Sequence, residues 1–146
     1  MIYPKKFIAY QKMVSKNKHI MGDILKTVIR KIISQGDGCN ISGLGVGYHN
    51  KKTNVRDPIG LLMGYVPQHH FGVISDDAQK SLVNNLITQF GFDDTQYSER
   101  HKFVDLLQQI QDAHDLAWCE FSNEKTNDPM TQFFGGCDAI KKEFRL

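Results

Sequence analysis

Alternating glycines make residues 41–48, Ile-Ser-Gly-Leu-Gly-Val-Gly-Tyr, the stretch of this chain best suited to ligand chemistry. Side chains of a strand alternate between two faces, so Gly43, Gly45 and Gly47 would leave one face bare. Either a ligand or a helix could then lie close against the backbone. With Tyr48 stacking on a base and Arg56 binding a phosphate, such a face could hold a nucleotide.

The same glycines do not form a standard phosphate-binding motif. They lack the Gly-Lys-Ser or Gly-Lys-Thr ending of a P-loop, and they do not fit the Gly-x-Gly-x-x-Gly spacing of dinucleotide-binding folds. We therefore favour a helix packed on the bare strand. For Arg56, the alternative to a phosphate is a charge pair with an acidic residue later in the chain.

His114 is the best single candidate for proton transfer. It lies four residues after Ile110 and three before Ala117, so on a helix it should point inward with the apolar side chains. Asp115, its neighbour in sequence, should point elsewhere, and adjacency alone therefore does not make a catalytic dyad. A histidine held in the core by a hydrogen bond is the reading we favour, and a catalytic or ligand-binding His114 is the alternative.

No other residues predict a metal site, a cofactor or a nucleophile. His69 and His70 are adjacent, but no Cys or His spacing typical of a zinc site accompanies them. The three cysteines, at 39, 119 and 137, are odd in number and widely separated. We expect them to be buried thiols in a reducing cytosol.

Composition predicts one folded domain over residues 1–146, with no membrane-spanning segment and no apolar signal sequence. Residues 1–60 carry eleven Lys or Arg and three Asp or Glu, whereas residues 61–146 carry seven and thirteen. The simpler interpretation is that these charges meet and cancel across the folded surface. The alternative is a basic face that binds phosphates or an acidic partner.

Apolar periodicity and capping residues predict the helices that must position these groups. We expect a short, peripheral N-terminal helix within residues 1–18, a second helix over about 20–35 and a short helix from Pro58. Further helices are expected to begin near residues 76 and 98 and at Pro129, with the one over about 98–121 the longest. The predicted fold is α+β and mainly α-helical, with five to six helices around a small β-hairpin that includes the glycine-rich strand.

Several short motifs resemble a family of small, uncharacterised proteins encoded by phages and prophages. The matching pieces are Cys39, Pro58-Ile59-Gly60-x-Leu62-Met63 and Leu106-Leu107-x-x-Ile110-Gln111-x-Ala113-His114-Asp115. Members of that family often carry a second cysteine where this chain has Arg56-Asp57-Pro58. The composition, rich in Asn, Lys and Ile, also resembles that of small accessory proteins of T-even-type phages. The resemblance implies an accessory protein that acts in the cytoplasm of an infected bacterium.

Three functions remain open from the sequence. The first is a non-enzymatic protein that binds a host protein during infection. The second is a protein that binds or sequesters a nucleotide or cyclic nucleotide through Gly43, Gly45, Gly47, Tyr48, Arg56 and His114. The third and weakest is a small hydrolase with His114 as its base. The chain lacks a basic helix with interleaved aromatic residues, which does not favour sequence-specific nucleic-acid binding, and self-association stays open.

Overall fold

The computed structural model describes residues 4–38, 49–50, 55–62 and 76–146, and side-chain positions are described for all of these except 49, 50 and 76–82. Five helices account for most of this part of the chain: α1 (Lys5–Gln35), α2 (Pro58–Leu62), α3 (Asp76–Phe90), α4 (Tyr97–Ser122) and α5 (Pro129–Glu143). The predicted, mainly helical fold is therefore confirmed for the described residues.

The predicted β-hairpin is not confirmed. Two strands of two residues each, β1 (His49–Asn50) and β2 (Val55–Arg56), pair antiparallel, with His49 opposite Arg56. The turn between them and the whole glycine-rich stretch lie outside the described residues. The structure thus contains a minimal strand pairing beside a helical core.

Helix α1 is one continuous helix of 31 residues and the longest in the described part of the chain. The expected division into two helices is wrong, as is the expectation that the helix from residue 98 would be the longest. Only Gly22 interrupts the helix-forming residues after Pro4, and one glycine costs a helix no more than about 1 kcal/mol. The helix ends at Gly36, whose φ of 81° provides the left-handed cap that the sequence predicts.

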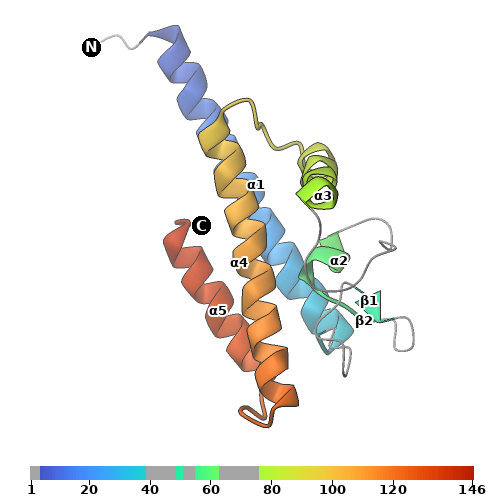
Figure 1. Ribbon diagram of the computed structural model, residues 1–146. Helices are drawn as coiled ribbons and strands as arrows, with labels where there is room; N and C mark the ends of the chain where they lie inside the picture. Colours follow the sequence, from blue (N-terminus) through green and yellow to red (C-terminus); the bar gives the residue numbers. More distant parts are fainter. Residues whose placement is uncertain (1–3, 39–48, 51–54, 63–75) are drawn as a thin grey trace.

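Helices α1, α4 and α5 lie alongside one another, with α4 and α5 forming an antiparallel hairpin, while α2 and α3 pack at one side (Figure 1). The core is formed by apolar side chains from all five helices. Its fully buried members include Ile24, Val28, Ile32, Leu62, Leu86, Phe103, Leu106, Ile110, Trp118 and Phe133. Two apolar residues that continue the helical spacing of the core residues lie outside the core: Ile33 is 58% exposed, because it projects from the far side of α1, and Phe121 is 48% exposed at the end of α4.

Local capping signals predict where the other helices begin and end. Asp57 Oδ1 accepts a hydrogen bond from the Gly60 amide at 2.7 Å, which caps α2. Asp128 Oδ1 accepts one from the Thr131 amide at 3.1 Å, which caps α5. Gly91, with a φ of 69°, follows the last residue of α3. These predictions are confirmed because each depends on neighbouring residues alone.

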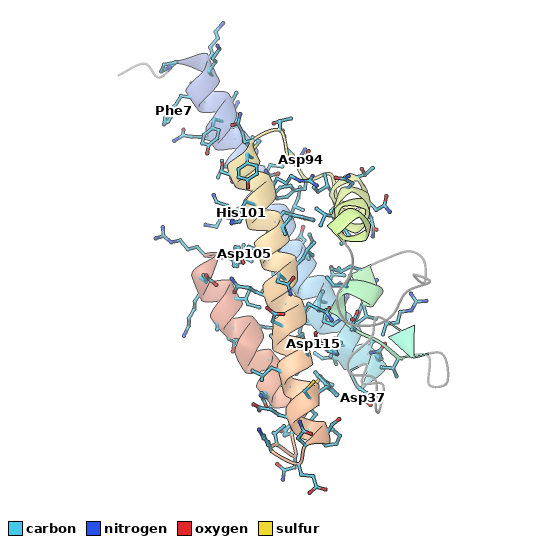
Figure 2. All side chains as sticks on the ribbon, in the orientation of Figure 1. Phe7, Asp37, Asp94, His101, Asp105 and Asp115 are labelled. Carbon is cyan, nitrogen blue, oxygen red and sulfur yellow. The ribbon has the colours of Figure 1, made fainter. Side chains whose placement is uncertain are left out.

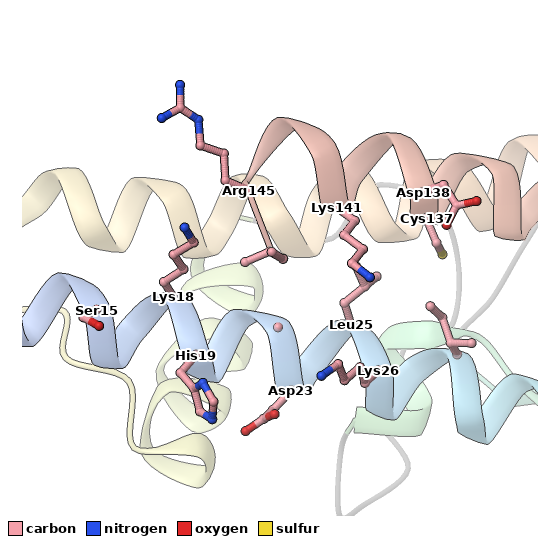
Figure 3. Close-up of a pocket in the computed structure, with 13 residues that line it drawn as sticks. Ser15, Lys18, His19, Asp23, Leu25, Lys26, Cys137, Asp138, Lys141 and Arg145 are labelled. Atoms are coloured by element: carbon pink, nitrogen blue, oxygen red, sulfur yellow. The ribbon is translucent and has the colours of Figure 1, made fainter.

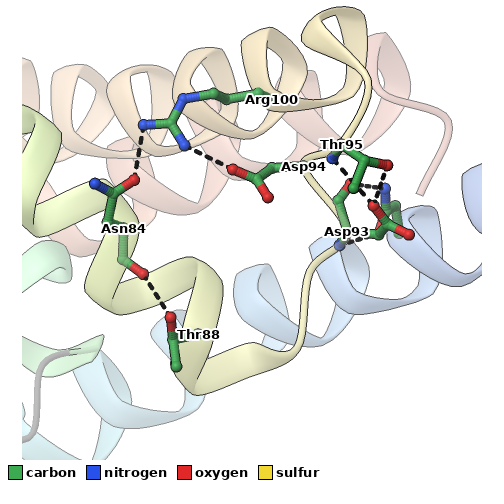
Figure 4. Close-up of polar contacts among 7 residues, drawn as sticks. Asn84, Thr88, Asp93, Asp94, Thr95 and Arg100 are labelled. Carbon is green, nitrogen blue, oxygen red and sulfur yellow. Dashed lines mark hydrogen bonds and ion pairs between the residues drawn. The ribbon is translucent and has the colours of Figure 1, made fainter.

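Polar contacts hold the connection between α3 and α4 against both helices (Figure 4). The Arg100 guanidinium donates to Asp94 Oδ2 at 2.8 Å and to Asn84 Oδ1 at 2.9 Å. On the other side, Asn17 of α1 is fully buried and both donates to the Asp93 carbonyl and accepts from the Asp93 amide. The start of α4 is therefore attached to α1 by hydrogen bonds as well as by apolar packing.

Candidate functional site

Two aromatic side chains of α4 pack against the backbone that leads into the glycine-rich stretch. The rings of His114 and Trp118 stack with centroids 4.8 Å apart and planes inclined by 23°. A Cβ atom placed on Gly38 would lie 2.4 Å from the Trp118 indole and 2.7 Å from His114 Nε2. Only glycine fits at position 38, because the rings of His114 and Trp118 pack directly against its backbone.

Asp37 joins the same contact. Its Oδ1 accepts hydrogen bonds from the Trp118 indole N–H and from the Gly38 amide, each at 2.8 Å. A buried tryptophan normally needs a partner for its N–H. The carboxylate of Asp37 supplies that partner and holds the chain against α4 immediately after α1 ends.

His114 is buried, as the helical spacing predicts, and it is hydrogen-bonded to Asp115. Its Nδ1 lies 2.9 Å from Asp115 Oδ1. The expectation that Asp115 points elsewhere is therefore wrong, because its side chain is long enough to turn back to the preceding ring.

Gln111 connects that pair to the start of α2. Its Nε2 donates to Asp115 Oδ1 at 3.0 Å and to Asp57 Oδ2 at 2.7 Å. A glutamine on the polar side of α4 would ordinarily face solvent, but α2 packs over that side of the helix. The Gln111 Oε1 atom is buried and has no hydrogen-bond partner among the described residues.

Asp57 is fully buried at the end of this network, beside the N-terminus of α2. The pKa of its carboxyl is raised from 3.8 to about 8. Burial is the main cause, the hydrogen bonds from Gly60 and Gln111 oppose the shift, and the negative charge of Asp115 adds to it. At pH 7 the folded protein therefore holds Asp57 mainly in its neutral, protonated form.

Of the predicted ligand residues, only Arg56 and His114 fall within the described residues, since Gly43, Gly45, Gly47 and Tyr48 lie outside them. The backbone of Arg56 is held by Gln35: its amide donates to Gln35 Oε1 at 2.8 Å and its carbonyl accepts from Gln35 Nε2 at 2.7 Å. Arg56 is next to Asp57 in the chain, and hydrogen bonds connect Asp57 through Gln111 and Asp115 to His114. The two predicted ligand residues, Arg56 and His114, are linked in this way.

The histidine and carboxylate have the arrangement of a general base and the group that orients it. The ring, however, is fully buried, stacked on Trp118 and covered by Gly38, so a substrate has no path to it through the described residues. The network connects the start of α2 to α4, and Asp37, which follows α1, bonds separately to Trp118 of α4 (Figure 2 labels Asp37 and Asp115).

The cysteines give no sign of nucleophilic chemistry in the described chain. Cys137 is buried, and burial raises the pKa of its thiol to about 12. Cys119 is half-buried, and burial likewise raises its pKa. A thiol with a raised pKa carries little thiolate at neutral pH, and thiolate is the reactive form. Cys39 lies outside the described residues.

Sequence reasoning missed Asn17, Gln111 and the polar contact of Trp118. The signal for Trp118 was available, because an indole on the apolar face of a helix requires an acceptor and Asp37 is an acidic residue in a turn. No local signal marks Asn17 or Gln111, since their partners lie 76 and 54 residues away.

Among residues 4–38, 49–50, 55–62 and 76–146, no three His, Cys, Asp or Glu side chains come together as metal ligands would. In the same residues, no helix has the length and apolar character needed to cross a bilayer. Comparison with family models, with curated proteins and with solved structures found no match to this chain.

Proposed function

We propose that this chain is a non-enzymatic binding protein that attaches to an acidic partner protein through the N-terminal part of α1, residues 5–16. The resemblance to phage and prophage proteins leads us to propose further that the partner is a protein of the infected bacterium. The observation that carries the proposal is an exposed apolar surface on a strongly basic, projecting helix.

Residues 5–16 extend beyond the other helices (Figure 1). Every residue from 5 to 12 is exposed. At 1.5 Å per residue, the segment from Lys5 to the first buried residue, Asn17, is about 18 Å long. That length gives three turns of preformed helix for a partner, which lowers the conformational entropy lost on binding.

The apolar side chains of this segment continue the stripe that α1 buries further along. Phe7, Tyr10 and Val14 lie at helical spacing ahead of Asn17 and Met21, which face the core. Phe7 and Tyr10 are 42% and 41% exposed, and Ile8 is 40% exposed beside them. Helices that bind in a groove use such a row of anchors at positions i, i+3 and i+7.

Charge identifies the kind of partner. Lys5, Lys6, Lys12 and Lys16 lie in this segment, and the first acidic residue of the chain is Asp23. A groove with an apolar floor and acidic rims complements this surface. A second copy of the chain would bring like charges together, which disfavours pairing of two α1 segments. An anionic membrane surface shares the charge, but three anchors form a narrow stripe compared with the broad apolar face of membrane-bound helices.

Within the described residues, the His114 ring is buried against Trp118 and Gly38, and this burial supports a binding function over hydrolysis. Nucleotide binding at the glycine-rich stretch stays a prediction, since four of its six residues lie outside the described part of the chain.

The test is a pull-down from bacterial lysate with the tagged chain and two variants of α1. One variant carries Phe7→Ser, Ile8→Ser and Tyr10→Ser, and the other carries Lys5→Glu, Lys12→Glu and Lys16→Glu. We expect the wild type to retain one acidic protein in stoichiometric amount and both variants to lose it. Because the changed residues are exposed, both variants should unfold at the wild-type denaturant concentration.

A control is Lys125→Glu and Lys142→Glu, which changes exposed lysines outside residues 5–16, one in the connection after α4 and one in the last turn of α5. This variant should retain the partner. Capture that is unaffected by the α1 variants would overturn the proposal, and so would the absence of any stoichiometric protein. Binding of residues 5–16 to anionic vesicles, or dimers of the chain that both α1 variants abolish, would also overturn it.

A further inference from the structure

A groove with a volume of about 340 Å³ lies between α1 and α5 (Figure 3). Its apolar lining includes Leu25, which is buried, Ile29 and the buried Cys137. Gly22 also lines it, and a Cβ placed there would meet no atom within 4 Å. The groove therefore has an open stretch of bare helix along one wall, within the roughly 300–1,000 Å³ range of small-molecule sites.

Cationic side chains stand on both walls. Lys18 extends from α1 toward α5, and Lys141 extends from α5 toward α1 (Figure 3). Lys26 and Arg145 also line the groove, whereas its carboxylates are only Asp23 and Asp138. In the described part of the chain, the ion pairs with carboxylates involve Arg100, Lys102 and His114. The four cationic residues of the groove therefore form no ion pair with a described carboxylate.

From this placement we infer that the groove between α1 and α5 binds a phosphorylated organic anion. The ammonium groups of Lys18 and Lys141, reaching in from opposite walls, bind the phosphate, and the apolar surface of Leu25 and Ile29 contacts the organic body. This inference does not rest on the proposed protein-binding function, because all residues that line the groove except Ser15 lie after the 5–16 segment, in α1 and at the C-terminal end of the chain.

The backbone at Arg145, which lines the end of the groove, is in a strained conformation. After α5, the Leu146 amide donates to the Lys141 carbonyl at 2.9 Å and the Arg145 amide donates to the Lys142 carbonyl at 3.3 Å. This Schellman turn places Arg145 at a φ of 56°, where glycine is the usual residue. An arginine here costs roughly 1 kcal/mol of cap stability relative to glycine. Its guanidinium points away from α1 (Figure 3), so Lys18 and Lys141 are the cations that reach into the groove.

Calorimetric titration of the full chain with ADP at low ionic strength tests the inference, with adenosine and inorganic phosphate as comparisons. We expect saturable binding of one ADP per chain. Adenosine lacks the anion and phosphate lacks the organic body, so each should bind at least about tenfold more weakly, a difference of 1.4 kcal/mol. Equal affinity for ADP and either comparison, or no saturable ADP binding, would overturn the inference.

Two substitutions separate the loss of the site from the loss of the fold. Gly22→Leu fills the groove from α1 and improves the helix propensity, so the variant should be at least as stable as the wild type yet should lose ADP binding. Arg145→Gly should relieve the strained cap and raise stability, and because its guanidinium points away from α1 it should change ADP binding less than Lys141→Gln does. The matched control is Glu124→Gly, which relieves the same kind of turn after α4, at a φ of 59°, away from the groove.

Two lysine substitutions on α5 complete the test. Lys141→Gln should weaken ADP binding about tenfold. Lys142→Gln removes an equal charge from the same turn of the helix but does not line the groove, so it should bind ADP as the wild type does. Wild-type binding by Gly22→Leu or Lys141→Gln, or equal losses in Lys141→Gln and Lys142→Gln, would show that ADP binds elsewhere or through net charge alone.

Discussion

The backbone of Gly38 lies against the indole of Trp118, at a separation that leaves no room for a Cβ atom. The contact lies where α1 has ended and the chain turns toward its glycine-rich stretch. It joins two residues that are 80 positions apart, and Asp37 reinforces it by accepting the indole N–H. The turn can pack against α4 in this position only because residue 38 is a glycine.

Replacing Gly38 by alanine should lower the free energy of unfolding by roughly 1–3 kcal/mol, because the new methyl group overlaps two rigid aromatic rings. Urea denaturation measures the change. Gly22→Ala is the matched control, since its methyl group meets open space and a helical alanine is more favourable than glycine by about 1 kcal/mol. A Gly38→Ala protein as stable as the wild type would contradict the packing described here.

Asn17 should be among the most sensitive polar positions of the chain. Its amide donates to the Asp93 carbonyl at 2.8 Å and to Glu99 Oε1 at 3.2 Å, and its oxygen accepts from the Asp93 amide at 2.9 Å. Asn17→Ala leaves all three groups without this partner and should cost at least about 2 kcal/mol by chemical denaturation.

Thr95→Ala is the control for Asn17, because Thr95 also bonds to Asp93 but is exposed. Its cost should stay below about 1 kcal/mol. If the two variants proved equally stable, the buried contacts of Asn17 would contribute no more than surface ones.

The raised pKa of Asp57 makes stability depend on pH. Between the ordinary value of 3.8 and the folded value of about 8, the folded protein keeps a proton that the unfolded chain has released. Raising the pH through this window therefore favours the unfolded chain, by up to about 1.4 kcal/mol per pH unit. Asp57→Asn keeps an oxygen to cap Gly60 and cannot titrate.

Urea denaturation of wild type and Asp57→Asn at several pH values across that window gives the contribution of this one group. The stability of the wild type relative to the variant should decrease as the pH rises, and should level off above about pH 8. If the difference in free energy of unfolding between wild type and Asp57→Asn did not change with pH, the pKa of Asp57 would be ordinary in the folded protein.

His114→Ala should destabilise the fold by roughly 2–4 kcal/mol, because it removes a buried ring stacked between Trp118 and the edge of Phe133. Asp115→Asn keeps an oxygen acceptor for Nδ1, so its cost should be smaller. If His114→Ala were instead fully stable and abolished a measurable hydrolysis, the hydrolase interpretation would replace the structural one.

Much of the helical layout could be predicted from the sequence because its signals are local. The Asp57-Pro58 and Asp128-Pro129 pairs indicate helix starts through a capping carboxylate and a preset φ, and Gly36 and Gly91 indicate ends through left-handed backbone. Helical spacing likewise predicts that His114 is buried, since the apolar positions around it define one face.

Contacts across the chain could not be predicted in the same way. The polar run around Asn17 resembles a break between helices, yet Asn17 is buried because Asp93 and Glu99 lie beside it. Gln111 resembles a surface residue, yet α2 covers it. Ile33 resembles a core residue, yet no described element packs over it.

The sequence by itself therefore determined that the fold is mainly helical, most of the helix ends, and the basic character of residues 1–60, because these follow from neighbouring residues and from charge; it did not determine that residues 5–35 form one helix. Tertiary structure alone decided that Gly38 meets Trp118, that Gln111 joins Asp57 to Asp115, and that α1 and α5 enclose a cationic groove. The physical reason is that the partners in each case lie tens of residues apart, and only the packing of whole helices brings them within contact distance.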